Sequence, residues 1–157
     1  MKKVWYFKTQ IGTIAIGCDE RGITDVTPSR VDGIEEKTPL IERAASEIDE
    51  YLKGERREFD LPLSVSGTEF QKAVWRELQK IPYGETRSYG DIAKSMGNPK
   101  ARRAVGTANN RNKIMIIIPC HRVIGANGHL TGYAGGLDMK KRLLDIEKAG
   151  CKTDSEK

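Results

Sequence analysis

The chain has 157 residues and a formal net charge of +5. This length allows one compact unit or two small lobes with a real core, and 38% hydrophobic residues argue against a disordered chain. A charge of this size only weakly favours a nucleic-acid partner. The three cysteines, Cys18, Cys120 and Cys151, contain no CxxC pair and leave an odd count, which argues against a disulfide framework.

No segment of the sequence predicts a signal peptide or a membrane-spanning helix. The apolar run in residues 1–8 is too short for a signal peptide, and no stretch approaches the length of a membrane span. We therefore expect a cytoplasmic protein with no membrane association. With two histidines, His121 and His129, and scattered cysteines, the chain has too few ligands at workable spacing for a zinc site. We expect no metal and no cofactor.

The first 62 residues predict a small antiparallel sheet with one helix. Short β-prone segments lie at 4–7, 13–17 and 23–26, separated by turn-like clusters. Thr38 and the proline after it supply an N-cap and a first-turn residue, and Gly54 closes the helix. The buried face of this helix is expected to hold Ile41, Ala44, Ala45, Ile48 and Leu52. Residues 1–62 would form an N-terminal lobe, joined by a linker at 63–67.

Two capped helices are predicted next, followed by a third. Thr68 begins a capping box with the glutamine three residues later, and Ser88 begins a second with an aspartate. Gly97 ends the second helix, and residues 98–99 are expected to begin the third. The buried face of the third helix is expected to hold Ala101, Ala104, Val105 and Ala108.

The outer face of the third helix is polar and basic. At 100° per residue this face gathers Lys100, Arg103, Gly106, Thr107 and Asn110. A short turn followed by a polar, basic helix is typical of the helix-turn-helix. Gly106 costs about 1 kcal/mol relative to alanine in a helix interior, and close approach of a phosphate backbone would explain it. The alternative is a solvated charged face with a tolerated glycine.

An apolar run leads to a cysteine and a histidine. Residues 114–118 (Ile-Met-Ile-Ile-Ile) predict a buried strand, which Pro119 should end so that Cys120 points in a defined direction. A thiol of ordinary pKa is only about 3% thiolate at neutral pH, so a nucleophilic cysteine needs a base or a positive neighbour. His121 is the candidate. The alternative is a buried structural cysteine beside an unrelated histidine.

The last part of the chain predicts a glycine-rich loop and a closing helix. The loop at 131–136 lacks the Gly-Lys-Ser/Thr ending of a phosphate loop, and its small residues suit a backbone that lies against a flat ligand. A helix is expected over 138–149, with Gly150 after it and a tail at 151–157. Its inward residues would be Leu143, Leu144 and Ile146. Cys18 is expected to be structural, and His129 and Cys151 to be exposed.

Several of these motifs together resemble one known family. They are residues 119–123 (Pro-Cys-His-Arg-Val), 132–137 (Gly-Tyr-Ala-Gly-Gly-Leu), 81–86, 88–90, 98–106 and 143–147, in the expected order. This pattern is similar to that of the methylated-DNA–protein-cysteine methyltransferases, also called O6-alkylguanine-DNA alkyltransferases. The resemblance covers about residues 68–150, whereas the first 60 or so residues are similar only in general layout.

The resemblance implies a fold and an activity. The fold is α/β (α+β), with a small N-terminal antiparallel sheet lobe and a mainly helical C-terminal domain over 68–150 that contains the helix-turn-helix and an active-site strand. The implied activity is DNA repair by a monomer that binds double-stranded DNA in the minor groove. It flips out O6-alkylguanine, and O4-alkylthymine, and transfers the alkyl group irreversibly to Cys120, once per molecule.

The resemblance also implies roles for residues around Cys120. Glu147 would polarise His121, which would deprotonate Cys120 through a water, by the logic of a catalytic triad. Asn112 would hold the hinge before the strand, and Arg122 would be a structural anchor.

Further residues would form the pocket and the DNA contact. Tyr89 would contact the flipped nucleotide, and Arg103 would fill the vacated position, while Met115 would form an apolar wall where family members commonly carry prolines. The remaining pocket residues would be Val123, Tyr133, Ala134 and Gly135. The remaining DNA contacts would be Lys100, Gly106, Thr107 and Asn110.

Two other functions are open. The first is a non-enzymatic helix-turn-helix protein that binds DNA or a lesion, against which the presence of Cys120 counts. The second is a cysteine hydrolase with a Cys-His-Glu triad, but the sequence has no evident oxyanion-hole motif and the basic helix would go unused.

Overall fold

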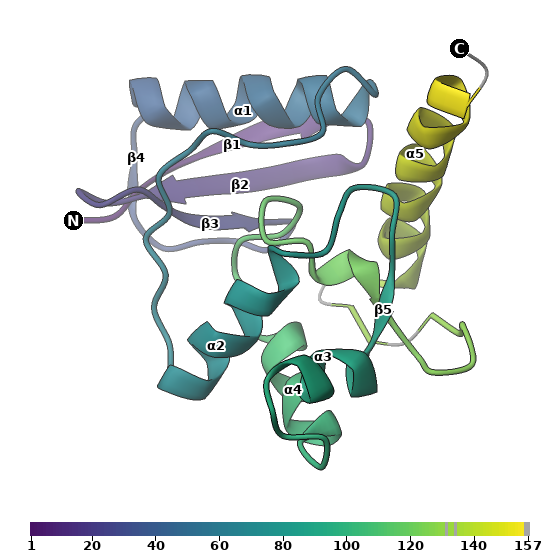
Figure 1. Ribbon diagram of the computed structural model, residues 1–157. Coiled ribbons are helices and arrows are strands. Elements are labelled where there is room, and N and C mark those ends of the chain that lie inside the picture. The colour runs from purple at the N-terminus through teal and green to yellow at the C-terminus, as the bar shows by residue number, and fades with distance from the viewer. Residues whose placement is uncertain (131, 134, 156–157) are drawn as a thin grey trace. The chain divides into compact units, whose positions relative to one another are not determined.

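The computed structural model describes residues 1–130, 132–133 and 135–155. The chain divides into two compact units, which are Met1–Ser66 with Lys113–Met115, and Gly67–Asn112 with Ile116–Lys157 (Figure 1). The first unit contains an antiparallel sheet and one helix, and the second is mainly helical. The α/β class expected from the sequence is confirmed.

The sheet of the first unit has the strand order β3-β2-β1-β4. The strands β1 (Lys3–Thr9), β2 (Gly12–Cys18) and β3 (Ile23–Thr27) form the expected antiparallel meander. The short strand β4 (Ile34–Glu35) pairs with β1 in parallel. The sequence did not predict β4, because two exposed residues carry no alternating pattern.

The helix α1 (Pro39–Leu52) lies along this sheet (Figure 1). Thr38 caps it, since its hydroxyl accepts a hydrogen bond from the N–H of Ile41 at 3.1 Å. Gly54 follows the helix with a φ of +79°, which glycine adopts without strain. The inward face holds Ile41, Ala44, Glu47, Ile48, Tyr51 and Leu52. The predicted helix is thus confirmed, and its buried apolar stripe faces the sheet.

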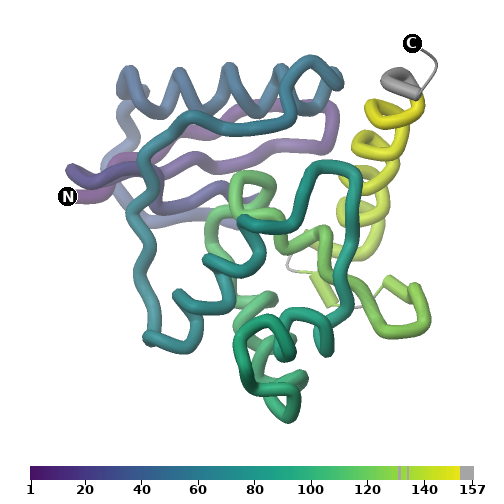
Figure 2. Tube along the Cα trace, in the orientation of Figure 1, coloured from purple at the N-terminus to yellow at the C-terminus, as the bar shows by residue number. Residues whose placement is uncertain are grey.

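Figure 2 follows the chain through the helices of the second unit. Its elements are α2 (Glu69–Leu78), β5 (Arg87–Ser88), α3 (Tyr89–Ser95), α4 (Arg102–Asn110), the 3-10 turn η1 (Cys120–Arg122), β6 (Val123–Ile124) and α5 (Leu137–Ser155). Both capping boxes, at Thr68 and at Ser88, are present. The indole N–H of Trp75 donates to the carbonyl of Ala108 at 2.9 Å, which joins α2 to α4.

The prediction that the third helix begins at residues 98–99 is wrong. The N–H of Ala101 donates to the carbonyl of Asn98, so residues 98–101 form a turn with Pro99 at its second position, which a proline favours. The helix α4 begins at Arg102 and buries Val105, Ala108 and Asn109. Ala104, expected to be buried, is exposed because this short helix has a narrow buried face.

The prediction of a strand over 114–118 is also wrong. Only Ile114 makes a β-bridge, with Val26 of β3, and the following residues turn. Ile116 has a φ of 72°, a region that β-branched residues rarely adopt. Periodicity could not separate a buried strand from a buried turn here, because all five side chains are apolar and four of them are buried.

The closing helix is longer than predicted. α5 continues through Gly150 to Ser155, so residues 151–155 are helical and not a tail. A Cβ at Gly150 would lie 2.6 Å from the hydroxyl of Tyr83. Gly150 therefore provides space for a neighbouring side chain and does not end the helix. Of the three residues expected to point inward, Leu143 is buried, and the other two are half-buried.

Among the described residues, no helix is long and apolar enough to cross a membrane.

The capping box of α2 generates a stability prediction. We expect Thr68→Ala to lower the free energy of unfolding by about 1 kcal/mol, because the backbone N–H of Gln71 loses the hydroxyl that accepts its hydrogen bond. Urea denaturation measures this change. Thr68→Ser, which keeps the hydroxyl, is the control and should cost much less. Equal losses in both variants would contradict a capping role.

Candidate functional site

Cys120 is held by a tight turn and a buried amide. Pro119 has φ −80° and ψ 63°, and the N–H of Cys120 donates to the carbonyl of Ile118 at 2.8 Å, which together form an inverse γ-turn. The side-chain amide of Asn112 donates to the same carbonyl at 2.9 Å. The turn therefore replaces the expected strand as the support of the thiol. Cys120 is 2% exposed.

Burial raises the pKa of the Cys120 thiol above its ordinary value. The amide of Asn112, the positive charge of Lys140 and the hydroxyl of Tyr133 act in the opposite direction. All three groups favour the thiolate, because each places a hydrogen-bond donor or a positive charge near the sulfur. The resemblance implied a hinge role for Asn112 and a pocket role for Tyr133, and it gave Lys140 no role.

Glu147 is the centre of a buried polar network. Its carboxylate is bonded to Nε2 of His121 at 2.6 Å and accepts a pair of hydrogen bonds from Arg122, with Nε at 2.9 Å and Nη2 at 3.0 Å. The N–H of Gly84 donates to Oε1 at 3.0 Å. Although burial alone would raise it, the bonds and charges of His121 and Arg122 bring the pKa of Glu147 down to about 2. Glu147 is therefore an anion.

The anion fixes the tautomer of His121. The ionised carboxylate of Glu147 can only accept hydrogen bonds. Nε2 of His121 therefore carries the proton, and Nδ1 is the basic nitrogen. Burial lowers the pKa of His121, and the charges of Arg122 and Lys140 lower it further, against the opposing effect of Glu147. His121 is therefore neutral near pH 7 and can act as a base through Nδ1.

Arg122 also contacts the segment at residues 81–84. Its Nη1 donates to the carbonyl of Ile81 at 2.7 Å, and its guanidinium lies 5.8 Å from the centroid of the Tyr83 ring. Gly84 has a φ of +81°, and a Cβ there would collide with the sulfur of Cys151. Cys151, expected to be exposed, is half-buried by this contact. The glycine lets the turn approach α5.

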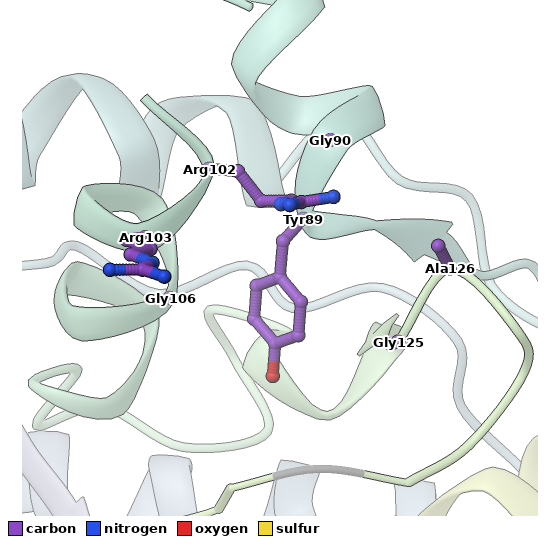
Figure 3. Close-up of a pocket in the computed structure, with 7 residues that line it drawn as sticks. All are labelled: Tyr89, Gly90, Arg102, Arg103, Gly106, Gly125 and Ala126. Atoms are coloured by element: carbon purple, nitrogen blue, oxygen red, sulfur yellow. The ribbon is translucent and has the colours of Figure 1, made fainter. Parts of the chain in front are cut away.

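A separate cavity of about 350 Å³ opens beside the helix-turn-helix (Figure 3). Tyr89 points its ring into this space, with Arg103 and Gly106 of α4 on one side and the backbone of Gly125 on the other. A Cβ at Gly106 would make ordinary contact with the ring, at 3.7 and 3.8 Å. Gly106 therefore faces Tyr89 as well as the outer side of α4. The cavity is lined by Tyr89, Gly90, Arg102, Arg103, Gly106, Gly125 and Ala126.

The other predicted DNA contacts lie on or near α4. Arg103, Thr107 and Asn110 are exposed on the helix, and Lys100 is exposed in the turn before it. The amide of Asn110 lies against the backbone of Gly132, so close that a Cβ on this glycine would be 2.9 Å from Nδ2. Asn110 therefore supports the glycine-rich loop as well as facing solvent.

The predicted pocket residues belong to different segments of the chain. Val123 is buried in β6, and Tyr133 and Gly135 are half-buried in the loop. Met115 is buried in the first unit, where its N–H donates to the carbonyl of Val26 at 3.0 Å, and its place in the pocket stays a prediction. Ala134 lies outside the described residues.

Several residues of this region were not predicted from the sequence. The positive charge of Lys140 favours the thiolate of Cys120, and the N–H of Gly84 donates to Glu147. Arg102 lines the cavity, and the side-chain amide of the buried Asn109 donates to the carbonyl of Cys120 at 3.4 Å. The spacing of Lys140 and Glu147, seven residues apart on one face of α5, was the available signal. Within the described part of the chain, no three His, Cys, Asp or Glu side chains gather where they could hold a metal ion.

The lowered pKa of His121 predicts a loss of stability in mild acid. Above its ordinary value of 6.5 the imidazole is neutral in both folded and unfolded states, so the full stability is present. Below it only the unfolded state takes the proton, and the free energy of unfolding should fall by up to about 1.4 kcal/mol per pH unit. The depressed pKa of Glu147 adds a second loss, which begins near 4.5 and ends near 2.

Urea unfolding between pH 7.5 and 5 measures the first loss. His121→Gln should flatten the slope in this window, whereas His129→Gln, which changes an exposed histidine, should keep it. A slope that survives in His121→Gln would contradict the assignment to His121.

Comparison with known proteins gives a consistent result over both units. The family model of the DNA-binding domain of 6-O-methylguanine DNA methyltransferase matches residues 69–149, and that of its ribonuclease-like domain matches residues 3–65. The methylated-DNA–protein-cysteine methyltransferase of Methanosarcina acetivorans is 52% identical to this chain, in an alignment that covers 90% of this chain and 95% of the relative. The constitutive methylated-DNA–protein-cysteine methyltransferase of Bacillus subtilis is 47% identical, in an alignment that covers 92% of this chain and 94% of the relative.

Solved structures agree. The crystal structure of Mycobacterium tuberculosis OGT in complex with DNA matches with a TM-score of 0.87 and 42% identity, over 95% of this chain and 93% of that one. The chain belongs to the methylated-DNA–protein-cysteine methyltransferase family.

Proposed function

We propose that this protein repairs DNA by moving the alkyl group of O6-alkylguanine, and of O4-alkylthymine, onto the sulfur of Cys120. The observation that carries the proposal is that Cys120 and His121 share one buried turn, with His121 bonded to the anionic Glu147. Relatives that match nearly the whole chain carry the corresponding activity in their names. This supports alkyl transfer over the alternative of a protein that only binds DNA.

The chemistry follows from the state of the side chains. Nδ1 of His121 takes the thiol proton through a water, and the Cys120 thiolate attacks the alkyl carbon in line. The new S–C bond forms as the O6–C bond breaks, the electron pair of the O6–C bond stays on guanine, and the proton taken from the thiol is delivered to N1 of the base. The product is a thioether. A thioether has no leaving group under these conditions, so each molecule reacts once.

The binding of double-stranded DNA is assigned to the face that carries α4. Lys100, Arg103 and Thr107 are exposed there and suit phosphate contacts, while the small Gly106 allows a close approach in the minor groove. The alkyl carbon is shielded inside duplex DNA, and extrusion of the base costs a few kcal/mol. Tyr89 would contact the extruded nucleotide from the cavity, and Arg103 would fill the vacated position.

The remaining assignments follow the same proposal. The base would enter a pocket formed with Val123, Tyr133, Ala134 and Gly135, whose backbone groups read the polar edge of guanine. The protein would act as a monomer in the cytoplasm, where its three free cysteines stay reduced. A cysteine hydrolase is disfavoured, because it would leave the basic face of α4 without a role.

The first functional prediction concerns the nucleophile. Cys120→Ala should abolish transfer of a radiolabelled methyl group from DNA to protein, while DNA affinity changes little, because the thiol performs chemistry and α4 supplies affinity. Cys18→Ser and Cys151→Ser are the matched controls and should keep the transfer. Label found on Cys120→Ala would refute the mechanism.

The second functional prediction concerns Arg103. Arg103→Ala should slow repair of duplex DNA far more than reaction with free O6-alkylguanine base, because the free base needs no extrusion. A loss of about 1.4 to 3 kcal/mol of stabilisation in the extruded state would lower the duplex rate roughly 10- to 150-fold. Single-turnover rates on both substrates measure the ratio.

The matched control is Arg142→Ala, an equal change of charge at an exposed position of α5, which should leave both rates unchanged. Equal slowing of Arg103→Ala on the two substrates would mean that the substitution damages the fold or Cys120, and the extrusion role would be withdrawn.

A further inference from the structure

Arg102 is the first residue of α4, and it lines the Tyr89 cavity together with Arg103. Consecutive residues of a helix point about 100° apart, so the two side chains diverge. In Figure 3, Arg103 lies beside Gly106 on α4. Arg102 extends instead toward Tyr89 and Gly90, at the start of α3. The two guanidinium groups therefore offer positive charge at two different places in the cavity.

The stem of Arg102 lies where Gly90 has no side chain. A Cβ at Gly90 would be 4.0 Å from Cδ of Arg102, which is an ordinary van der Waals distance. The apolar stem thus runs along the first turn of α3, an arrangement that leaves the charged end of an arginine in water. Arg102 is exposed, so its side chain is accessible to a ligand.

Among the described residues, no carboxylate compensates the charge of Arg102. The cavity lining consists of a tyrosine, an alanine, three glycines and two arginines. Asp91, in the first turn of α3, serves as a cap and accepts a hydrogen bond from the N–H of Ser88 at 2.9 Å. Arg87 of β5 shows the ordinary arrangement, with an ion pair to Glu85 at 2.9 Å. Arg102 has no such bond within the described part of the chain. The cavity is therefore a concave, positively charged site that suits an anion.

In the proposed function, the anion that reaches this cavity is a phosphate of DNA. An extruded nucleotide stays joined to its strand by two phosphodiesters, and each of them carries a negative charge. Tyr89 is assigned to this nucleotide, and Arg102 extends toward Tyr89. A guanidinium group can bind two phosphate oxygens through parallel N–H donors, and such charged hydrogen bonds are stronger than neutral ones.

We propose that Arg102 binds a phosphodiester that flanks the extruded nucleotide and so holds this nucleotide outside the duplex. The inference rests on the proposed function and adds a residue to it. Arg103 acts at the position that the base has vacated, whereas Arg102 acts on the charge of the backbone. Arg102 makes no contact with the reacting atoms, so its contribution is to binding and extrusion.

The test removes the two charges separately. A methylphosphonate, which carries no negative charge, replaces the phosphodiester on the 5′ side or on the 3′ side of O6-methylguanine in a duplex. The protein is the full chain with Cys120→Ala, so that affinity is measured without transfer. Arg102→Met removes the guanidinium group and keeps an unbranched stem. Arg111→Met is the matched control, because Arg111 is an exposed arginine that follows α4 and does not line the cavity.

We expect one of the two methylphosphonates to weaken binding by the parent protein about tenfold, as for the loss of a hydrogen bond between charged groups. Arg102→Met should bind the unmodified duplex about tenfold more weakly, and the same methylphosphonate should then change its affinity by less than about twofold. Arg111→Met should keep the full sensitivity. The slope of log affinity against log salt should become shallower by about one in Arg102→Met.

Equal sensitivity of Arg102→Met and Arg111→Met to each methylphosphonate would overturn the proposal. A parent protein that is insensitive to both methylphosphonates would also overturn it, and this measurement needs no change at Arg102. A separate assay with Cys120 intact decides the proposed function. A protein that binds the duplex but accepts no methyl group would refute alkyl transfer, while the affinities would still decide the role of Arg102.

Discussion

The buried pair of Arg122 and Glu147 is the interaction on which the second unit depends. It joins η1 to α5 by two parallel hydrogen bonds, and Gly84 and Ile81 attach the turn at 82–84 to the same two side chains. A buried ion pair is tolerated only when its remaining polar atoms are also bonded. Here the carboxylate accepts from a guanidinium, an imidazole and a backbone N–H, so three segments are placed by one anion.

This network explains why the nucleophile stands on a turn and not on a strand. A strand would send Cys120 and His121 to opposite faces, whereas the 3-10 turn η1 lets His121 reach Glu147 while Cys120 stays beside Asn112. Over residues 137–152 of α5, where burial is described, the buried positions are Lys140, Leu143 and Glu147, and two of these three are polar. The helix supplies charge to the site as well as core.

The two proposed tasks of the protein fall to different elements. The proposed chemistry depends on η1 and α5, and the proposed DNA contact depends on α4 with the Tyr89 cavity. The glycines serve close packing in both places. Gly84 and Gly150 admit the sulfur of Cys151 and the hydroxyl of Tyr83, and Gly106 lies against the ring of Tyr89. Substitution of either of the first two would disturb the support of Glu147 without touching a reacting atom.

The sequence by itself determined the features that depend on near neighbours. The cap of α1, the two capping boxes and the three long strands follow from residues a few positions apart, and the Pro-Cys-His-Arg-Val motif was among those that indicated the family. The tertiary structure decided what depends on distant partners. The run at 114–118 became a turn because Asn112 and Val26 take up its backbone bonds, and Gly150, within α5, leaves room for the hydroxyl of Tyr83. No local pattern contains these partners, since each lies on another segment of the chain.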